Sequence, residues 1–139
     1  MKAVKRKYAV VFDLEFTAWE GSVAARWSRT GEHTEVVQIG AVKLDAERLV
    51  IVDEFAMLVK PRINPVLSDY LTNLTGITNE AIAARGVDFV TAFRAFLDFA
   101  GPAKSWAFGR DDLILAGNLK LYAWQGLTPP PYEIGRAHV

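Results

Sequence analysis

Hydrophobic residues along this chain first form three runs with the composition of β-strands. Residues 8–14 (YAVVFDL) are β-branched and aromatic, which is typical of a buried central strand. Residues 35–44 and 49–59 are similar and predict a second and a third strand. The polar link at 45–48 is short, so these two strands are expected to form an antiparallel hairpin. The polar stretch at 19–34 predicts a loop before the hairpin.

The second half of the chain changes to helical spacing, with apolar residues three and four positions apart between Asp88 and a Gly101-Pro102 stop. The expected elements are a short helix over 68–73, a helix starting at Thr78 or Asn79, a helix over 88–100, a strand over 105–108 and a helix over 111–124. The last helix offers four residues to the core: Leu113, Ile114, Leu119 and Leu121. This order indicates one α/β domain over 1–139, a mixed sheet with helices packed on it.

The composition narrows the chemistry that the chain can perform. None of the 139 residues is cysteine, which excludes a disulfide framework, a thiol nucleophile and a cysteine-ligated zinc site. The 16 basic and 16 acidic residues cancel, so the chain lacks a global basic field for gripping nucleic acid. No apolar run reaches the roughly 20 residues that span a bilayer, and no signal peptide is recognisable. A cytoplasmic protein without a membrane partner is the expectation.

Two carboxylates, Asp13 and Glu15, stand at the end of the first predicted strand. Because side chains alternate along a strand, both are expected to face the same side of the sheet. Neighbouring like charges are costly unless protons or a cation neutralise them, and Mg²⁺ and Mn²⁺ prefer carboxylate oxygens. The alternative is that the strand ends at Leu14 and both acids are solvated.

A second acidic pair, Asp111 and Asp112, follows the strand predicted at 105–108. Ligands collect at strand ends in α/β sheets, although an acid that opens a helix also serves as an N-cap. Asp111 is expected to cap the helix or to lie in its first turn, which leaves Asp112 to face inward. If this strand neighbours the first one, Asp112 meets Asp13 and Glu15, and the three carboxylates form a site for two metal ions.

Four motifs occur in the order found in the DEDD, or DnaQ-like, exonuclease superfamily. They are VFDLEFT at 11–17, EVVQIGAVKL at 35–44, NLTGIT at 73–78 and SWAFGRDD at 105–112. The chain resembles most closely the RNA-trimming branch with the histone-mRNA and enhanced-RNAi exonucleases, over Tyr8 to about Tyr132. The resemblance implies the ribonuclease-H-like α/β fold. It also implies a metal-dependent 3′–5′ exonuclease that releases nucleoside 5′-monophosphates from single-stranded ends, with RNA slightly favoured over DNA.

The resemblance further implies roles for individual residues. Asp13 and Glu15 match the metal-binding carboxylates of the first motif, and Asp112 matches the aspartate of the second, with Asp111 as the alternative. The implied cofactor is Mg²⁺ or Mn²⁺ in a two-ion site, which activates water and stabilises the leaving 3′ oxygen. The residues implied to border the terminal nucleotide are Leu14, Phe16, Thr17, Leu74, Thr75, Gly76 and Ile77. The last four can equally form a plain turn between two helices.

The chain departs from the family at the third motif, a general-base histidine followed by a metal-binding aspartate. His33 lies in a predicted loop, and His138 is penultimate with no aspartate after it. His138 is either the base or part of a frayed tail. The C-terminal part is expected to be shortened, truncated or divergent. Because loss of a general base costs on the order of 10²–10⁴ in rate, weak or no activity is expected unless other residues complete the site.

Two functions of other classes stay open at this point. The first is a catalytically inactive nucleic-acid-binding module, in which aromatic residues such as Trp19 and Trp27 stack on bases. The second is a structural or interaction domain that binds no oligonucleotide. Metal-dependent trimming of a labelled oligonucleotide would separate the enzyme from both. The sequence does not determine the oligomeric state.

Overall fold

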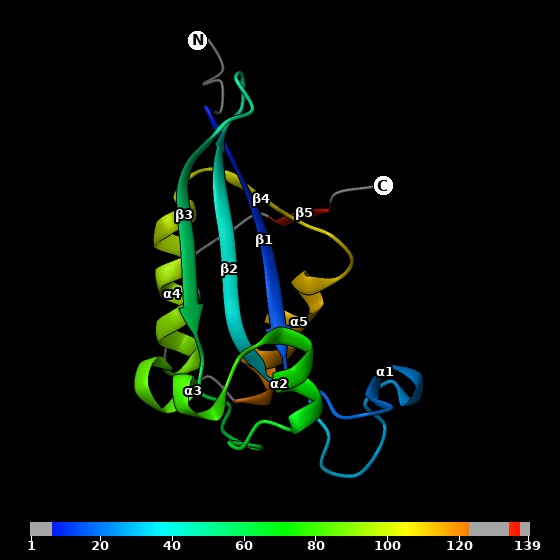
Figure 1. The fold of residues 1–139 in the computed structure, drawn as a ribbon. Helices are drawn as coiled ribbons and strands as arrows, with labels where there is room; N and C mark the ends of the chain where they lie inside the picture. The colour runs from blue at the N-terminus through cyan, green and yellow to red at the C-terminus, as the bar shows by residue number, and fades with distance from the viewer. Residues whose placement is uncertain (1–6, 123–133, 137–139) are drawn as a thin grey trace.

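Five strands form one mixed sheet in the computed structural model, which describes residues 7–122 and the backbone of residues 134–136. The strands are β1 (Tyr8–Phe16), β2 (Val36–Asp45), β3 (Ile51–Leu58), β4 (Lys104–Ala107) and β5 (Ile134–Arg136). Their order across the sheet is β3-β2-β1-β4-β5 (Figure 1). β1, β2 and β3 pair antiparallel, whereas β4 is parallel to β1 and β5 is parallel to β4. β1 is therefore the central strand.

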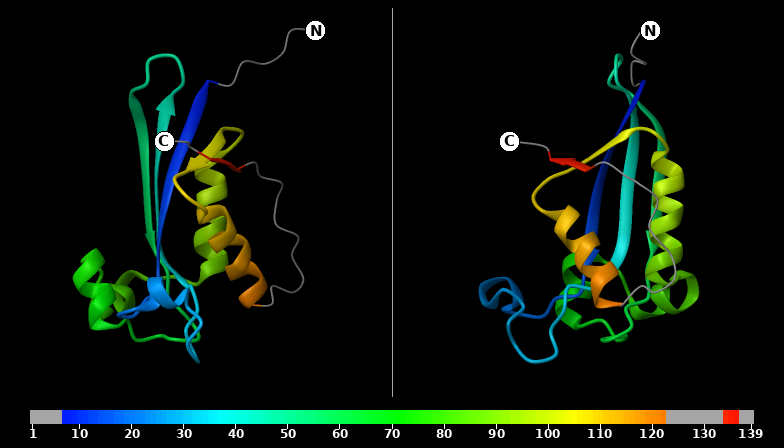
Figure 2. Two further views of the ribbon diagram at one scale, coloured as in Figure 1. Left: turned by 90° about the vertical axis from the view of Figure 1, so that its right-hand side faces the viewer. Right: turned by 180° about the vertical axis from the view of Figure 1, so that it is seen from behind.

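Helices cover one face of the sheet and close one end of it. They are α1 (Ser22–Ala25), α2 (Asp69–Thr75), α3 (Asn79–Arg85), α4 (Phe89–Ala100) and α5 (Asp111–Leu121). α4 and α5 lie on the same side of the sheet, while α2 and α3 lie at the end where β1 finishes (Figure 1, Figure 2). Ser68, Thr78 and Asp88 cap α2, α3 and α4 by accepting a hydrogen bond from a first-turn amide. None of the described helices is long and apolar enough to cross a membrane.

The main core lies between the sheet and α4. Val10, Phe12 and Leu14 point to that side because they alternate along β1. They meet the buried face of α4, where the ring of Phe96 lies 5.2 Å from that of Phe12 between centroids. The intervening residues of β1 face the opposite side, and the described residues place no helix over most of it (Figure 1).

The predicted elements are confirmed with small shifts. The hairpin, the three helices after it and β4 lie within two residues of their predicted positions. β1 runs two residues further than expected, to Phe16, and the loop predicted at 19–34 contains the single-turn helix α1. Trp124, the predicted end of the last helix, lies outside the described residues. The α/β class, a mixed sheet flanked by helices, is confirmed.

The rotation of α5 about its axis differs from the prediction. Leu113 is 53% exposed, whereas Leu115 is fully buried, so the prediction of Leu113 as a core residue is wrong. The reason is that Asp111 faces β1 and residues four apart share a helix face, which directs Leu115 inward. Asn118 continues this face, is 1% exposed and accepts a hydrogen bond from the Val36 amide at 2.9 Å.

Candidate active site

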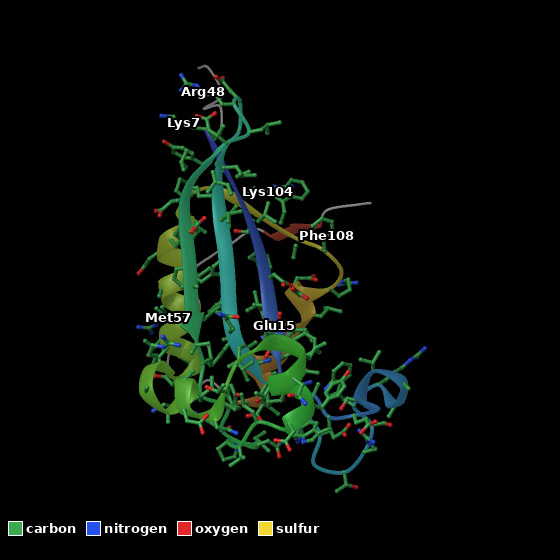
Figure 3. The ribbon with its side chains drawn as sticks, in the orientation of Figure 1. Lys7, Glu15, Arg48, Met57, Lys104 and Phe108 are labelled. Atoms are coloured by element: carbon green, nitrogen blue, oxygen red, sulfur yellow. The ribbon has the colours of Figure 1, made fainter. Side chains whose placement is uncertain are left out.

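Glu15 lies near the end of β1, on the open side of the sheet (Figure 3). Asp13 lies on the same side, because side chains two positions apart on a strand share a face. Strand pairing continues through Phe16, so the alternative of an earlier strand end does not hold. Asp13 stands opposite Gly40 of β2, and Glu15 stands opposite Gln38. Asp13 is exposed and Glu15 is half-buried. Burial, reinforced by the charge of Asp13, raises the pKa of Glu15.

The segment after β4 brings a third carboxylate, that of Asp111, close to Asp13 and Glu15. β4 pairs with β1 only over residues 9–11, so the edge of β1 beyond that point is open to the start of α5. The chain turns at Gly109, whose φ of +66° suits glycine, and α5 begins at Asp111. The Leu14 amide of β1 donates a hydrogen bond to Oδ2 of Asp111 at 3.2 Å. Asp111 is thereby held beside the carboxylates of β1.

Asp111 shows the electrostatic effect of this crowding. Burial raises its pKa to about 6, and the charges of Asp13 and Glu15 and a hydrogen bond with Asp13 add to the rise. The hydrogen bond from the Leu14 amide acts in the opposite direction and does not outweigh them. Three interacting carboxylates, Asp13, Glu15 and Asp111, therefore lie at this end of the sheet.

The carboxylate beside Asp13 and Glu15 is that of Asp111, the alternative, and not that of Asp112, the residue predicted for this position. Asp112 forms an ion pair with Arg110, with 3.2 Å between Oδ1 and Nε. Successive residues of a helix point about 100° apart, so only one of the two aspartates can face β1. The metal-binding role predicted for Asp112 therefore falls to Asp111, and for Asp111 it stays a prediction.

The chemistry of these three groups suits a hard divalent cation. In the described part of the chain, no three acidic or imidazole groups are already positioned to hold one ion together. Asp111 instead keeps its proton to a higher pH beside Asp13 and Glu15, and a bound cation would neutralise the same charges. Oxygen donors of this kind fit Mg²⁺ or Mn²⁺, with Asp13, Glu15 and Asp111 as the residues that would hold it.

The predicted substrate residues at the end of β1 differ in their surroundings. Leu14 is 4% exposed and packs in the core, so only its backbone borders the site. Thr17 is buried, and its hydroxyl donates to the His33 carbonyl at 2.5 Å and accepts from the Glu35 amide at 3.0 Å. Phe16 is half-buried. The fold already engages Leu14 and Thr17, and nucleotide contacts of all three residues stay predictions.

The segment Leu74–Ile77 comprises the last two residues of α2 and the start of the turn that leads to α3. Gly76 ends α2 with a φ of +78°, and the hydroxyl of Thr75 is engaged in hydrogen bonds within the turn. Ile77 is buried in a second apolar cluster, whereas Leu74 is 66% exposed. The interpretation as a helix-to-helix turn is therefore confirmed. Leu74 and Gly76 present the exposed surface that a nucleotide contact requires, and that contact stays a prediction.

Glu35, the first residue of the second predicted strand, is a buried carboxylate directly before β2. It is 0% exposed. It accepts hydrogen bonds from the amides of Arg62, Ile63 and Asn64 at 2.8, 2.7 and 2.9 Å, and from the Tyr122 hydroxyl at 2.9 Å. Burial, reinforced by the charge of Glu35, raises the pKa of Tyr122. Glu35 thus fixes the loop after β3 and the end of α5 beside Thr17. Because these partners are distant in sequence, no local signal could have identified Glu35 as a buried acid.

The two histidines leave the general base unassigned. His33 is half-buried in the loop between α1 and β2, where its carbonyl accepts the hydroxyl of Thr17. His138, the other candidate base, lies outside the described residues.

Comparison with known proteins decides the family. The RNase_T family model, described as exonuclease, matches residues 10–127. The chain belongs to this exonuclease family. Its DEDD superfamily resemblance and its place near the histone-mRNA exonucleases are confirmed by the relatives and structures below. The family comprises 3′–5′ exonucleases that generally use divalent metal ions.

Curated relatives of this exonuclease-family chain are exoribonucleases and exonucleases. ERI1 exoribonuclease 2 of Xenopus laevis is 32% identical over 78 residues, which are 55% of this chain and 10% of the relative. The 3′–5′ exonuclease eri1 of Schizosaccharomyces pombe is 34% identical over 51% of this chain and 22% of its own length. The 3′–5′ exonuclease Snipper of Drosophila melanogaster is 30% identical over 64% and 30%. The matched part is thus under a third of each relative.

Solved structures share the fold. The nuclease domain of 3′hExo, a DEDDh family member bound to rAMP, has a TM-score of 0.73 and 26% identity, and the match covers 91% of this chain and 63% of that one. A 3′-exonuclease that recognises the histone mRNA stem-loop has a TM-score of 0.69 at 24% identity, covering 84% and 41%. The ribonuclease-H-like fold of the exonucleases is therefore confirmed.

The titration of Asp111 predicts a pH effect on stability. An acid whose folded-state pKa is raised binds its proton more tightly when folded, so its contribution is fully present below the unfolded pKa of 3.8 and is lost as the pH rises through about 6. We therefore compare the free energy of unfolding of the wild type with that of Asp111→Asn, both in chelator. The advantage of the wild type over the variant is expected to be about 1 kcal/mol smaller at pH 7 than at pH 4, allowing for solvent screening. Urea unfolding at both pH values measures it, and a difference independent of pH would contradict the shift.

Proposed function

We propose that this chain carries the metal-binding half of a 3′–5′ exonuclease site that trims single-stranded nucleic acid, with RNA favoured over DNA. The observation that carries the proposal is the approach of Asp111 to Asp13 beside Glu15, because three carboxylates in one place need a cation or protons. The names of the relatives support RNA as the substrate, since several are exoribonucleases. The cofactor we propose is Mg²⁺ or Mn²⁺, held by Asp13, Glu15 and Asp111.

The position of each residue indicates which part of the substrate it would contact. Asp13 and Glu15 of β1 approach a phosphodiester from the open side of the sheet, and Asp111 approaches it from the start of α5. A bound divalent ion would supply Lewis-acid stabilisation of the charge that builds on the phosphate. The exposed side chain of Leu74 and the half-buried ring of Phe16 would hold the terminal nucleotide so that its phosphate stays at the carboxylates.

The experiment is a trimming assay of the chain on labelled single-stranded RNA with Mn²⁺. We expect release of nucleoside 5′-monophosphate that chelator and Asp13→Ala abolish. The expected rate is low because neither histidine of the sequence is followed about five residues later by an aspartate, and loss of a general base costs about 10²–10⁴ in rate. Robust turnover that Asp13→Ala abolishes would contradict the predicted weakness and confirm the site. Binding without trimming, indifferent to chelator, would instead support an inactive nucleic-acid-binding module.

A further inference from the structure

Arg110 and Asp112 form an ion pair on either side of Asp111, at the start of α5. The Nε and Nη2 groups of Arg110 donate hydrogen bonds to the two carboxylate oxygens of Asp112 at 3.2 and 3.3 Å. Two hydrogen bonds between one guanidinium and one carboxylate fix the orientation of the guanidinium as well as its position. The pair therefore holds in one orientation an arginine whose neighbour in the chain belongs to the candidate active site.

Stability of the fold does not account for this ion pair. The side chain of Arg110 is 48% exposed and that of Asp112 is 25% exposed, and ion pairs open to solvent contribute little to stability. Arg110 is also the N-cap residue of α5, yet its side chain caps no amide of the helix. A cation at this end faces the positive pole of the helix dipole, which is unfavourable. The sequence thus places a positive charge where helix formation alone disfavours it.

The guanidinium of Arg110 keeps hydrogen-bond donors available for a ligand. Two of its nitrogens donate to Asp112, and its other N–H groups have no acceptor within residues 7–122. Within the same residues it forms no ion pair with Asp13, Glu15 or Asp111. The guanidinium therefore does not neutralise these three carboxylates, and their charge stays available to a metal ion.

The location of Arg110 suits a phosphate of the substrate. Asp111, the next residue, accepts a hydrogen bond from the Leu14 amide, which lies between Asp13 and Glu15 in β1. Consecutive Cα atoms are about 3.8 Å apart, so Arg110 stands at the rim of the three carboxylates. A phosphodiester that these carboxylates hold through a divalent ion would have the ion on one side and the guanidinium on another. A guanidinium matches a phosphate in charge and in hydrogen-bond geometry.

We propose that Arg110 binds the phosphate of the terminal nucleotide and that Asp112 acts through Arg110 as a positioning residue. The inference rests on the proposed function and gives Asp112 a role other than metal binding. The phosphate in question leaves with the released nucleoside 5′-monophosphate, so the contact persists in the product. Lysine in place of Arg110 would keep the charge but not the planar fork that Asp112 orients.

The experiment measures the binding of UMP, a nucleoside 5′-monophosphate, to the full chain by calorimetry at saturating Mn²⁺. Arg110→Gln is expected to weaken UMP binding about 10-fold, because it removes a charged hydrogen-bond donor from the phosphate. Arg110→Lys should bind UMP more tightly than Arg110→Gln and less tightly than the wild type. Uridine, which lacks the phosphate, should bind all three proteins with the same affinity.

Asp112→Asn tests the positioning role through the sign of its effect. Removal of a negative charge near a phosphate would by itself strengthen UMP binding. Loss of the orientation of Arg110 weakens it instead, and we expect a weakening of about 3-fold. In the Arg110→Gln background the same substitution should not weaken binding further, because the two residues act as one unit. Tighter UMP binding by Asp112→Asn would overturn the positioning role.

The matched control is Arg48→Gln, which removes the same charge from the hairpin tip at the far end of the sheet (Figure 3). Arg48 and Arg110 are both exposed, so both variants should unfold at the urea concentration of the wild type. Equal UMP affinities of Arg110→Gln and Arg48→Gln, with binding still weakened by Asp13→Asn, would overturn the role of Arg110 and leave the proposed function standing. A wild type that binds no UMP, or binds it with no effect of Asp13→Asn, would overturn the proposed function and the role of Arg110 together.

Discussion

Replacing Asp111 with asparagine is expected to remove most of the stabilisation that Mn²⁺ gives to the folded chain, whereas Asp112→Asn is expected to keep it. Asp111 is held at the Leu14 amide beside Asp13, and Asp112 faces Arg110. Loss of one of three carboxylates removes a ligand and a negative charge. We therefore expect metal affinity to fall by at least 10- to 100-fold, by analogy with the effect of removing outer-shell partners.

A thermal-shift titration with Mn²⁺ at pH 7 measures this without any requirement for activity. Ligand that binds only the folded state raises the unfolding temperature with concentration, so the midpoint of the rise reports affinity. The two variants are matched controls for each other because they remove the same charge from consecutive residues. Retained stabilisation in Asp111→Asn together with loss in Asp112→Asn would reverse the assignment and return it to the residue favoured by the sequence.

The change from Asp112 to Asp111 shows which part of the site the sequence could not predict. The spacing of Asp13 and Glu15 on a strand fixes their common face, because alternation is a local property of extended backbone. Which aspartate of the pair at 111–112 joins them depends on the point at which β4 leaves β1 and on the rotation of α5. Both are set by contacts between segments almost a hundred residues apart, such as the Leu14–Asp111 hydrogen bond. The same rotation explains why Leu115 is buried and Leu113 is not.

More of the fold than of the site could be predicted from the sequence, for a related reason. Residues close together in sequence determine the β2–β3 hairpin and the N-caps of α2, α3 and α4. The turn and capping interactions involved span only three or four positions. Glu35 is the opposite case. Its amide partners lie 27 to 29 residues later and its Tyr122 partner lies 87 residues later, so nothing near it in sequence distinguishes it from a solvated acid.

Glu35→Ala is expected to lower the free energy of unfolding by about 2–4 kcal/mol, because several neutral donors lose their common acceptor. The carboxylate is fully buried, and its removal leaves the amides of the 62–64 loop and the Tyr122 hydroxyl without their acceptor. A fully buried donor left unsatisfied costs about 1–3 kcal/mol, and the donors of the 62–64 loop cost less because that loop is partly exposed to water. Urea unfolding measures the loss, with Glu54→Ala as the control. Glu54 is exposed on β3, and its removal should change stability by less than about 0.5 kcal/mol.

Glu35→Gln separates the role of charge from that of shape in this network. Glutamine keeps the volume and one acceptor oxygen, but its amino group faces other donors. The decrease in the free energy of unfolding caused by Glu35→Gln should therefore lie between the decreases caused by Glu54→Ala and by Glu35→Ala. The effect should also reach the site, because the Glu35 amide and carbonyl hold Thr17 directly after β1. A Glu35→Ala chain that unfolds like Glu54→Ala would mean that the loop and Tyr122 find other acceptors. In that case the hydrogen bonds of Thr17 alone would fix the end of β1.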